Sequence, residues 1–228
     1  MLCGYVRGRC GVEGDGPFPG IIDLYGSVGG LVEHRASLLA NHGFLVLALG
    51  YFGFDDLPKD FINLDLEYFE EAVNFLRQQP KVISPGVGAL GISKGGDLAL
   101  SMATFVPHVT AVVSIGGCNA NTLEKAEGYF LIVVGEDDKN WRTPLYAQQA
   151  VERLEENGRE NYELISYPEA GHLLEPSYFP FCSASFHRLV GQPVAWGGKM
   201  KPHALAQIDL WPKIQTFLRK HLENHSKL

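Results

Sequence analysis

The chain has 228 residues, of which 46% are hydrophobic and 20% are charged, and its formal net charge is −7. This length buries one sizeable core but is short for two, so we expect a single domain over residues 1–228. An acidic balance without a basic cluster argues against nucleic acid as a partner. No apolar run is long enough for a membrane span or a signal peptide.

The predicted elements alternate along the chain, because apolar runs of strand length are separated by stretches of helical period. Continuous runs of Val, Ile, Leu and aromatic residues are typical of strands buried on both faces. The pattern therefore predicts an α/β fold with a mostly parallel sheet flanked by helices, and it disfavours an antiparallel sandwich. The expected strands are Gly20–Leu24, Phe44–Leu49, Gly88–Ile92, Thr110–Ile115, Tyr129–Val134 and Tyr162–Ser166, and the expected helices are Leu31–Ala40, Leu64–Gln78, Gly95–Phe105, Leu145–Glu156 and Leu205–His221.

Three stretches lie outside this alternation. Residues 1–16 are expected to form a poorly defined N-terminal segment. Leu173–His203, with its Pro, Gly and aromatic residues, is predicted to be an irregular excursion packed on the domain. The connection Gly116–Gly128 is short for a parallel crossover, so Asn121–Glu127 has room for one or two helical turns.

The cysteines are too scattered to suggest a shared site. They form no C-x-x-C pair, which favours free thiols over a zinc site or a compact disulfide framework. No cofactor or metal is therefore expected. The positions are Cys3, Cys10, Cys118 and Cys182.

A candidate nucleophile stands between an expected strand and an expected helix. The segment from Gly91 to Gly95 reads GISKG and matches G-x-S-x-G, the pattern that holds a serine in a strained turn. The residues two before and two after the serine must be small for such a turn to close, and both are glycine. A serine that merely caps the following helix is the alternative. The strand-to-helix context favours Ser93 as a nucleophile.

A carboxylate and a histidine follow two later strands, at the sheet edge where open parallel sheets bind ligands. The order Ser93, acid, His172 is that of an α/β-hydrolase triad and differs from the order in other serine-triad folds. Among the acids we favour Asp138, which lies a full turn beyond its strand. Glu136 and Asp137 remain alternatives, and a metal site on this acidic trio lacks further ligands.

The glycine-rich loop Leu24–Gly30 follows the first expected strand and leads into a helix. Its backbone N–H groups can point at a developing oxyanion. A phosphate-cradling or merely tight turn is the alternative, although the loop lacks the spacing of the known phosphate motifs. The expected oxyanion donors are the N–H of Lys94 and one N–H between Leu24 and Gly26, for which we name Leu24.

Several segments together resemble one known family. PFPGIIDLYG, LEYFEEAV, LGISKGGDLALSMA, IVVGEDD, YPEAGHLLEPSYFP and WGG occur in this order from Gly16 onward. They are similar to the catalytic α/β-hydrolase domain of type I acyl-CoA thioesterases and bile acid-CoA:amino acid N-acyltransferases. The resemblance implies hydrolysis of fatty acyl-CoA through an acyl-enzyme, with Ser93 as nucleophile, Asp138 as acid and His172 as base. Serine rather than cysteine as the nucleophile of the strained turn resembles the thioesterase branch of the family. The Lys94 side chain could attract CoA phosphates or be a solvated surface charge.

The resemblance also implies two missing parts. The family's catalytic domain follows a β-rich N-terminal domain, whereas the first expected strand begins here at Gly20, and the family's connection at Gly116–Gly128 is much longer. We therefore expect a shortened member with a thin roof over its acyl pocket. The alternatives are an acyl-CoA:amino acid N-acyltransferase, a carboxylesterase, or a catalytically impaired chain that only binds acyl-CoA.

The last three residues, Ser226-Lys227-Leu228, match the carboxyl-terminal tripeptide that the peroxisomal import receptor reads. They predict a peroxisomal location, with the cytosol as the alternative. That address also favours a lipid-derived CoA thioester as substrate.

Overall fold

The computed structural model describes residues 7–11, 14–83, 86–118 and 122–223 of the chain. Within these ranges one sheet has the strand order β1-β3-β2-β4-β5-β6-β7, and it is parallel except where β1 pairs with β3. The strands are β1 (Gly8–Gly11), β2 (Gly20–Leu24), β3 (Leu45–Leu49), β4 (Val87–Ile92), β5 (Val109–Ile115), β6 (Tyr129–Gly135) and β7 (Tyr162–Tyr167). The helices are α1 (His34–Asn41), α2 (Leu66–Arg77), α3 (Lys94–Phe105), α4 (Thr143–Glu156) and α5 (Met200–Glu223).

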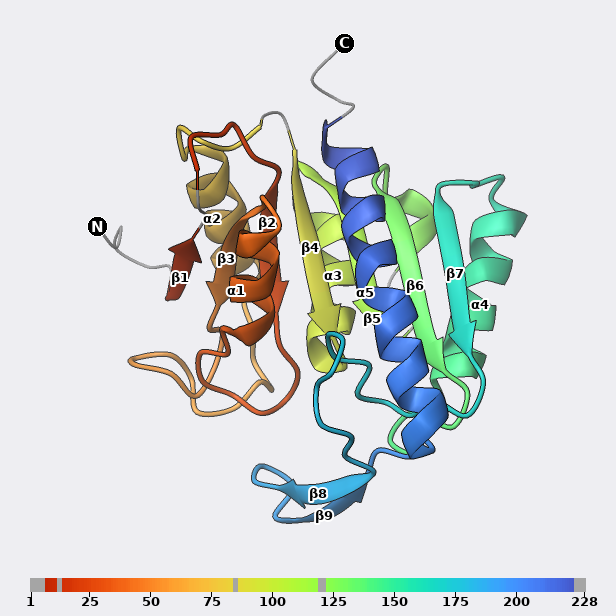
Figure 1. The fold of residues 1–228 in the computed structure, drawn as a ribbon. Helices are drawn as coiled ribbons and strands as arrows, with labels where there is room; N and C mark the ends of the chain where they lie inside the picture. The colour runs from red at the N-terminus through yellow and green to blue at the C-terminus, as the bar shows by residue number, and fades with distance from the viewer. Residues whose placement is uncertain (1–6, 12–13, 84–85, 119–121, 224–228) are drawn as a thin grey trace.

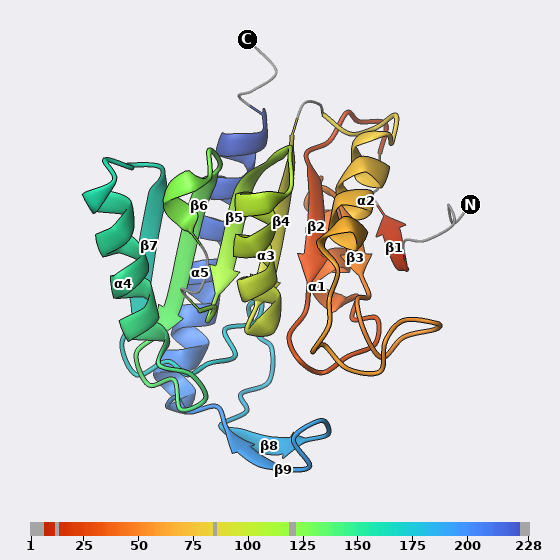
Figure 2. The same ribbon diagram turned by 180° about the vertical axis from the view of Figure 1, so that it is seen from behind.

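Helices cover both faces of the sheet. Figures 1 and 2 show α1 and α5 on one face and α2, α3 and α4 on the other. Successive strand residues point to opposite faces, so Ile22 and Leu47 join one core while Ile21 and Val46 join the other. Burial on both faces explains the continuous apolar runs. The predicted α/β fold with a mostly parallel sheet is confirmed.

The strands and helices predicted from the sequence are all present, with bounds that differ by a few residues. The largest shift is in α5, which begins at Met200 rather than at Leu205. Pro202 lies in the first turn of α5, where a missing backbone N–H costs no helical hydrogen bond. Helix α1 begins at His34 rather than at Leu31. Within the described ranges, no helix is long and apolar enough to cross a membrane.

Two irregular stretches contain strands that the sequence did not predict. The N-terminal segment contains β1, a short strand with no apolar run, which forms because the edge of β3 offers it free backbone groups. The stretch Leu173–His203 contains a hairpin of β8 (Ala184–His187) and β9 (Gln192–Ala195). Its strands are mostly exposed, so they carry no alternating apolar pattern that would reveal them.

The connection between β5 and β6 contains one short element. A single 3₁₀ turn, η1 (Leu123–Lys125), stands where one or two helical turns were expected. Leu123 and Ala126 are nevertheless buried, and they join the core on the face of α3 and α4. The described residues of this short crossover therefore close the sheet with a 3₁₀ turn and no α-helix.

Candidate active site

Ser93 occupies a strained turn between β4 and α3. Its φ of 56° and ψ of −124° lie in a region that residues with a side chain rarely adopt. A Cβ at Gly91 would lie 2.0 Å from the Gly95 carbonyl oxygen, and one at Gly95 would lie 2.1 Å from that of Leu24. Both positions therefore require glycine. The Ser93 side chain makes no capping hydrogen bond to α3. The structure therefore does not support the alternative that Ser93 merely caps this helix.

His172 and Asp138 form a buried pair. Nδ1 of His172 lies 2.7 Å from Oδ2 of Asp138, and both side chains are fully buried. The backbone N–H groups of Asn140 and Trp141 donate to Oδ1 of Asp138 at 2.8 and 2.9 Å, and the Thr143 hydroxyl donates to Oδ2 at 2.8 Å. The carboxylate is thus fixed in place. It can accept the Nδ1 proton, which leaves Nε2 of a neutral ring free to take a proton.

The other two candidate acids point elsewhere. Asp137 pairs with Lys139 at 2.5 Å and accepts the backbone N–H of Gly198 at 2.9 Å. These hydrogen bonds lower the pKa of Asp137 below its ordinary value. Glu136 accepts a hydrogen bond from the exposed Ser166 hydroxyl at 2.8 Å. Of the three acids, the structure brings Asp138 to His172.

Two tryptophan rings pack against the imidazole ring of His172. Its ring stacks on Trp196 with centroids 5.6 Å apart and an angle of 14°, and Trp141 lies 6.0 Å away. Nε2 of His172 is buried, and no described residue forms a hydrogen bond with it. The Ser93 hydroxyl is among the groups that do not. Catalytic hydrogen bonds are often long before substrate binds and tighten only in the complex.

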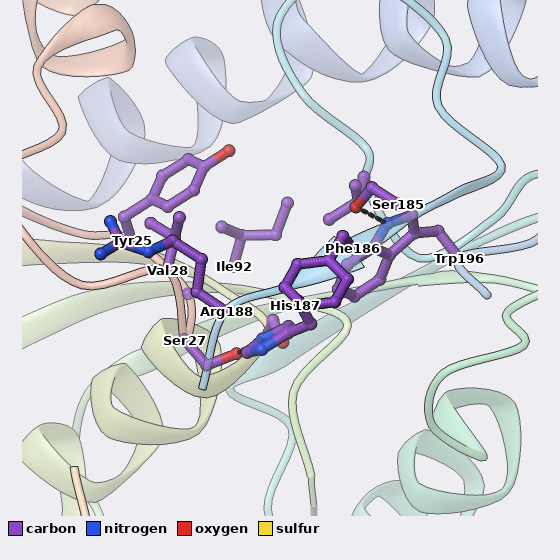
Figure 3. Close-up of a pocket in the computed structure, with 12 residues that line it drawn as sticks. Tyr25, Ser27, Val28, Ile92, Ser185, Phe186, His187, Arg188 and Trp196 are labelled. Carbon is purple, nitrogen blue, oxygen red and sulfur yellow. Dashed lines mark hydrogen bonds between the residues drawn. The ribbon is translucent and has the colours of Figure 1, made fainter. Parts of the chain in front are cut away.

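A cavity of about 270 Å³ opens beside Ser93. Its walls come from the loop after β2, the turn at Ser93, Leu173 and the β8–β9 hairpin (Figure 3). A 2.8 Å hydrogen bond between His187 and Ser27 attaches the hairpin to the loop after β2. A second bond of 2.8 Å, from the Trp196 indole to Ser185, closes the base of the hairpin itself. No described residue of the connection 116–128 lines this cavity. The thin roof expected over an acyl pocket stays a prediction, and in this cavity the hairpin supplies part of the wall.

The loop after β2 brings backbone N–H groups to the nucleophile. A Cβ added to Gly26 would lie 3.3 Å from Cβ of Ser93. Gly26 is buried, and neither its N–H nor that of Ser27 has a hydrogen-bond partner among the described residues. Leu24 instead ends β2, in register with Gly91. Lys94 begins α3, so its N–H has no partner one turn back along the helix.

The charged side chain of Lys94 does not extend into the cavity. Its ammonium lies 2.8 Å from a carboxylate oxygen of Asp97, one turn further along α3. Lys94 is also absent from the residues that line the cavity wall. This contact matches the alternative that Lys94 is a surface charge.

A buried polar network includes the end of β2 and the loop that follows it, and it was not predicted from the sequence. Glu175 accepts hydrogen bonds from the Tyr25 hydroxyl and from Nε2 of His34, the latter at 3.0 Å. Burial alone would raise the pKa of Glu175, but the His34 hydrogen bond, the charge of Arg35 and the Tyr25 hydroxyl lower it. Arg35 also pairs with Asp23 at 2.5 Å, with both side chains buried. Asp23 inside the apolar strand GIIDL was the available signal, since a buried charge needs a partner.

His203 supports the loop that carries His172. Its Nδ1 accepts the backbone N–H of Gly171 at 3.0 Å, and its Nε2–H donates to the carbonyl of Leu173 at 2.9 Å. The bond from Gly171 requires the neutral ring with its proton on Nε2, because a protonated ring cannot accept at Nδ1. Burial lowers the pKa of His203, although the Leu173 carbonyl acts in the opposite direction. The neutral His203 ring therefore holds the backbone on both sides of His172, at Gly171 and at Leu173.

Comparison with protein families gives a match over most of the chain. The family described as BAAT / acyl-CoA thioester hydrolase C terminal matches residues 64–126 and 121–224. The two pieces meet inside the connection that the sequence predicts to be shortened.

Curated relatives are similar over nearly the whole chain. Human acyl-coenzyme A thioesterase 1 is 45% identical over 275 aligned positions, which cover 99% of this chain and 65% of the relative. Human mitochondrial acyl-coenzyme A thioesterase 2 is 44% identical, with coverage of 97% and 56%. The chain thus spans less than two thirds of the length of these relatives.

Solved structures with low sequence identity share the fold. A dienelactone hydrolase-like promiscuous phosphotriesterase from metagenomic libraries has a TM-score of 0.67 and 20% identity, covering 96% of this chain and 99% of that one. A putative dienelactone hydrolase from Klebsiella pneumoniae has a TM-score of 0.62 and 16% identity, covering 92% and 90%. At such identities the likeness shows an α/β-hydrolase-like fold alone.

Proposed function

The chain belongs to the BAAT/acyl-CoA thioester hydrolase family, and from this premise we propose that it hydrolyses fatty acyl-CoA to free fatty acid and CoA. The observation that carries the proposal is the buried His172–Asp138 pair, which lies at the same carboxyl edge of the parallel sheet as the strained Ser93. A nucleophile, a base and an acid that orients the base are the parts that acyl transfer through an acyl-enzyme requires.

The proposed reaction has two halves. His172 Nε2 accepts the Ser93 proton as the hydroxyl oxygen attacks the thioester carbonyl carbon, and Asp138 stabilises the charged imidazole. The carbon–sulfur bond then breaks, and the departing CoA sulfur takes the proton from His172 Nε2, which returns the imidazole to its neutral form. In the second half His172 removes a proton from water, the hydroxide attacks the acyl-enzyme, and Ser93 regains its proton as the fatty acid departs.

Two backbone N–H groups are proposed to receive the oxyanion. The first belongs to Lys94, at the start of α3. For the second we now favour Gly26 over Leu24, because Gly26 contacts Ser93 and its N–H has no partner among the described residues. A buried N–H without a partner is costly, and an oxyanion would satisfy it.

The decisive experiment measures free thiol released from acyl-CoA by the purified chain. Parallel reactions contain glycine or taurine, so that an N-acyl product would identify an acyltransferase. An ester without CoA serves as the test for a general carboxylesterase. We expect thiol release from acyl-CoA that does not depend on the amino acid. Absence of turnover with every acyl length, in folded protein, would refute the proposal.

The carboxyl-terminal tripeptide 226–228 lies outside the described residues. We propose that it directs the chain to peroxisomes through the import receptor. A fluorescent protein fused ahead of the full chain should collect in peroxisomes. The same fusion without the last three residues should remain in the cytosol.

A further inference from the structure

Tyr51 contacts the loop that carries a proposed oxyanion donor. It lies just after β3 and is 4% exposed. Its hydroxyl is 2.6 Å from the carbonyl oxygen of Tyr25 and 3.1 Å from that of Gly26. The hydroxyl has one proton, so the shorter contact with Tyr25 is the main hydrogen bond. Burial raises the pKa of Tyr51, which keeps the hydroxyl protonated as a donor.

Two carbonyls held at one point fix the direction of two N–H groups. In a planar trans peptide, the N–H points opposite to the carbonyl of the preceding residue. With the Tyr25 and Gly26 carbonyls turned to Tyr51, the N–H groups of Gly26 and Ser27 point to the other side. Neither of these N–H groups has a hydrogen-bond partner among the described residues.

We propose that Tyr51 is a positioning residue, which holds the loop 25–27 with its N–H groups directed at the oxyanion. The inference rests on the proposed function, in which Ser93 attacks a thioester. Tyr51 does not line the cavity, so it acts through the backbone and not by contact with substrate. Donors fixed before the reaction need no reorganisation as charge develops, which is the main advantage of an oxyanion site.

A second anchor holds the same loop by a side chain. The Tyr25 hydroxyl bonds to Glu175, on the segment that follows His172. Loss of the Tyr51 hydroxyl therefore loosens the peptide orientation without releasing the whole loop. The expected defect is partial, and smaller than the loss of an oxyanion donor itself.

Tyr51→Phe tests the proposal by deleting one oxygen atom. We expect kcat to fall roughly 10- to 100-fold, below the ~10²–10³-fold cost of removing an oxyanion donor, with KM nearly unchanged. The matched control is Tyr68→Phe. The Tyr68 hydroxyl also bonds to a backbone carbonyl, that of Gly50 at 2.5 Å, but away from the cavity. This control should lose a similar amount of thermal stability and keep its kcat.

Two substrate analogues separate positioning from structural damage. A trifluoromethyl ketone analogue of acyl-CoA adds the Ser93 oxygen and forms an oxyanion, whereas a thioether analogue cannot. In Tyr51→Phe the affinity for the ketone should fall by the same factor as kcat, and the affinity for the thioether should stay as in the wild type. An unchanged kcat, or equal losses for both analogues, would overturn the proposal.

Labelling of Ser93 by a fluorophosphonate gives a readout that does not need acyl-CoA. Phosphonylation forms a bond from the serine oxygen to phosphorus and expels fluoride, with negative charge developing on the phosphoryl oxygen. Its rate should fall in Tyr51→Phe but not in Tyr68→Phe. If the wild type labels at Ser93 yet hydrolyses no acyl-CoA, the proposed function fails while this comparison still decides the role of Tyr51. Equal labelling rates in both variants would refute that role.

Discussion

The carboxyl edge of the sheet and the β8–β9 hairpin meet beside the same nucleophile, but they are held in different ways. At the sheet edge, the Asp138 and His172 side chains are fully buried and hydrogen-bonded to each other, and two backbone N–H groups also donate to Asp138. In the hairpin, Phe186 is 63% exposed although it lines the cavity. Rigid, buried elements position chemical groups most accurately. We therefore expect the chemistry to depend on the sheet edge and substrate selection to depend on the hairpin.

The largest effect is expected at the sheet edge, from Ser93→Ala. Without its nucleophile the chain should lose on the order of 10⁶-fold in kcat, because only the oxyanion site and substrate binding would remain to accelerate the reaction. Thermal unfolding should remain close to that of the wild type. The measurement is thiol release with matched melting curves. Substantial activity in folded Ser93→Ala protein would contradict the assignment.

Asp138→Asn should rank second. An amide cannot hold the imidazole in the required tautomer, so kcat should fall about 10³–10⁴-fold. The matched control is Asp137→Asn, whose side chain contacts Lys139 and Gly198 and not His172. This control should change kcat by less than about 3-fold, as for a surface position. Steady-state kinetics on both variants decides the assignment, and the reverse ranking would place the acid at Asp137.

In the hairpin, Phe186→Ser should affect long acyl chains selectively. Loss of part of an aromatic contact of about 1.5 kcal/mol should raise KM for a long-chain acyl-CoA by about 10-fold and leave a short-chain substrate nearly unchanged. Leu189→Ser is the control, because Leu189 lies in the same hairpin, is 43% exposed and does not line the cavity. Equal KM changes for all chain lengths would mean that the hairpin does not select substrate.

The smallest expected effect concerns the pH dependence of stability. Because the pKa of His203 is lowered in the folded chain, its contribution is present above its ordinary pKa of about 6.5 and is lost as pH falls through the lower folded value. His203→Gln keeps an acceptor for Gly171 and a donor for Leu173 but does not titrate. When melting curves are compared from pH 7 down to pH 5, the wild-type melting temperature should fall further than that of the variant. Parallel melting curves would show that His203 does not titrate in this range.

The sequence predicts features that arise from local steric or periodic rules. The β4–Ser93–α3 turn could be predicted because Gly91 and Gly95 are the residues that its geometry requires. The roles of Ser93, Asp138 and His172 remain predictions, although the structure places two of these side chains in contact. The β8–β9 hairpin was not predicted because strands with little burial carry no alternating apolar pattern. The roles of Tyr51 and Glu175 depend on contacts with Tyr25, and no local pattern encodes such long-range contacts.

The short length of the crossover between β5 and β6 affects the entropy of closing this loop. That entropy grows only with the logarithm of length, so halving a flexible connection changes the free energy of closing it by only ~0.6 kcal/mol. The short connection keeps its core contribution through Leu123 and Ala126, which fill space between α3 and α4. A long or a short crossover can therefore join these two strands at nearly equal conformational cost. The length of this segment can vary while β5 and β6 stay in the register that brings Ser93, Asp138 and His172 to one edge.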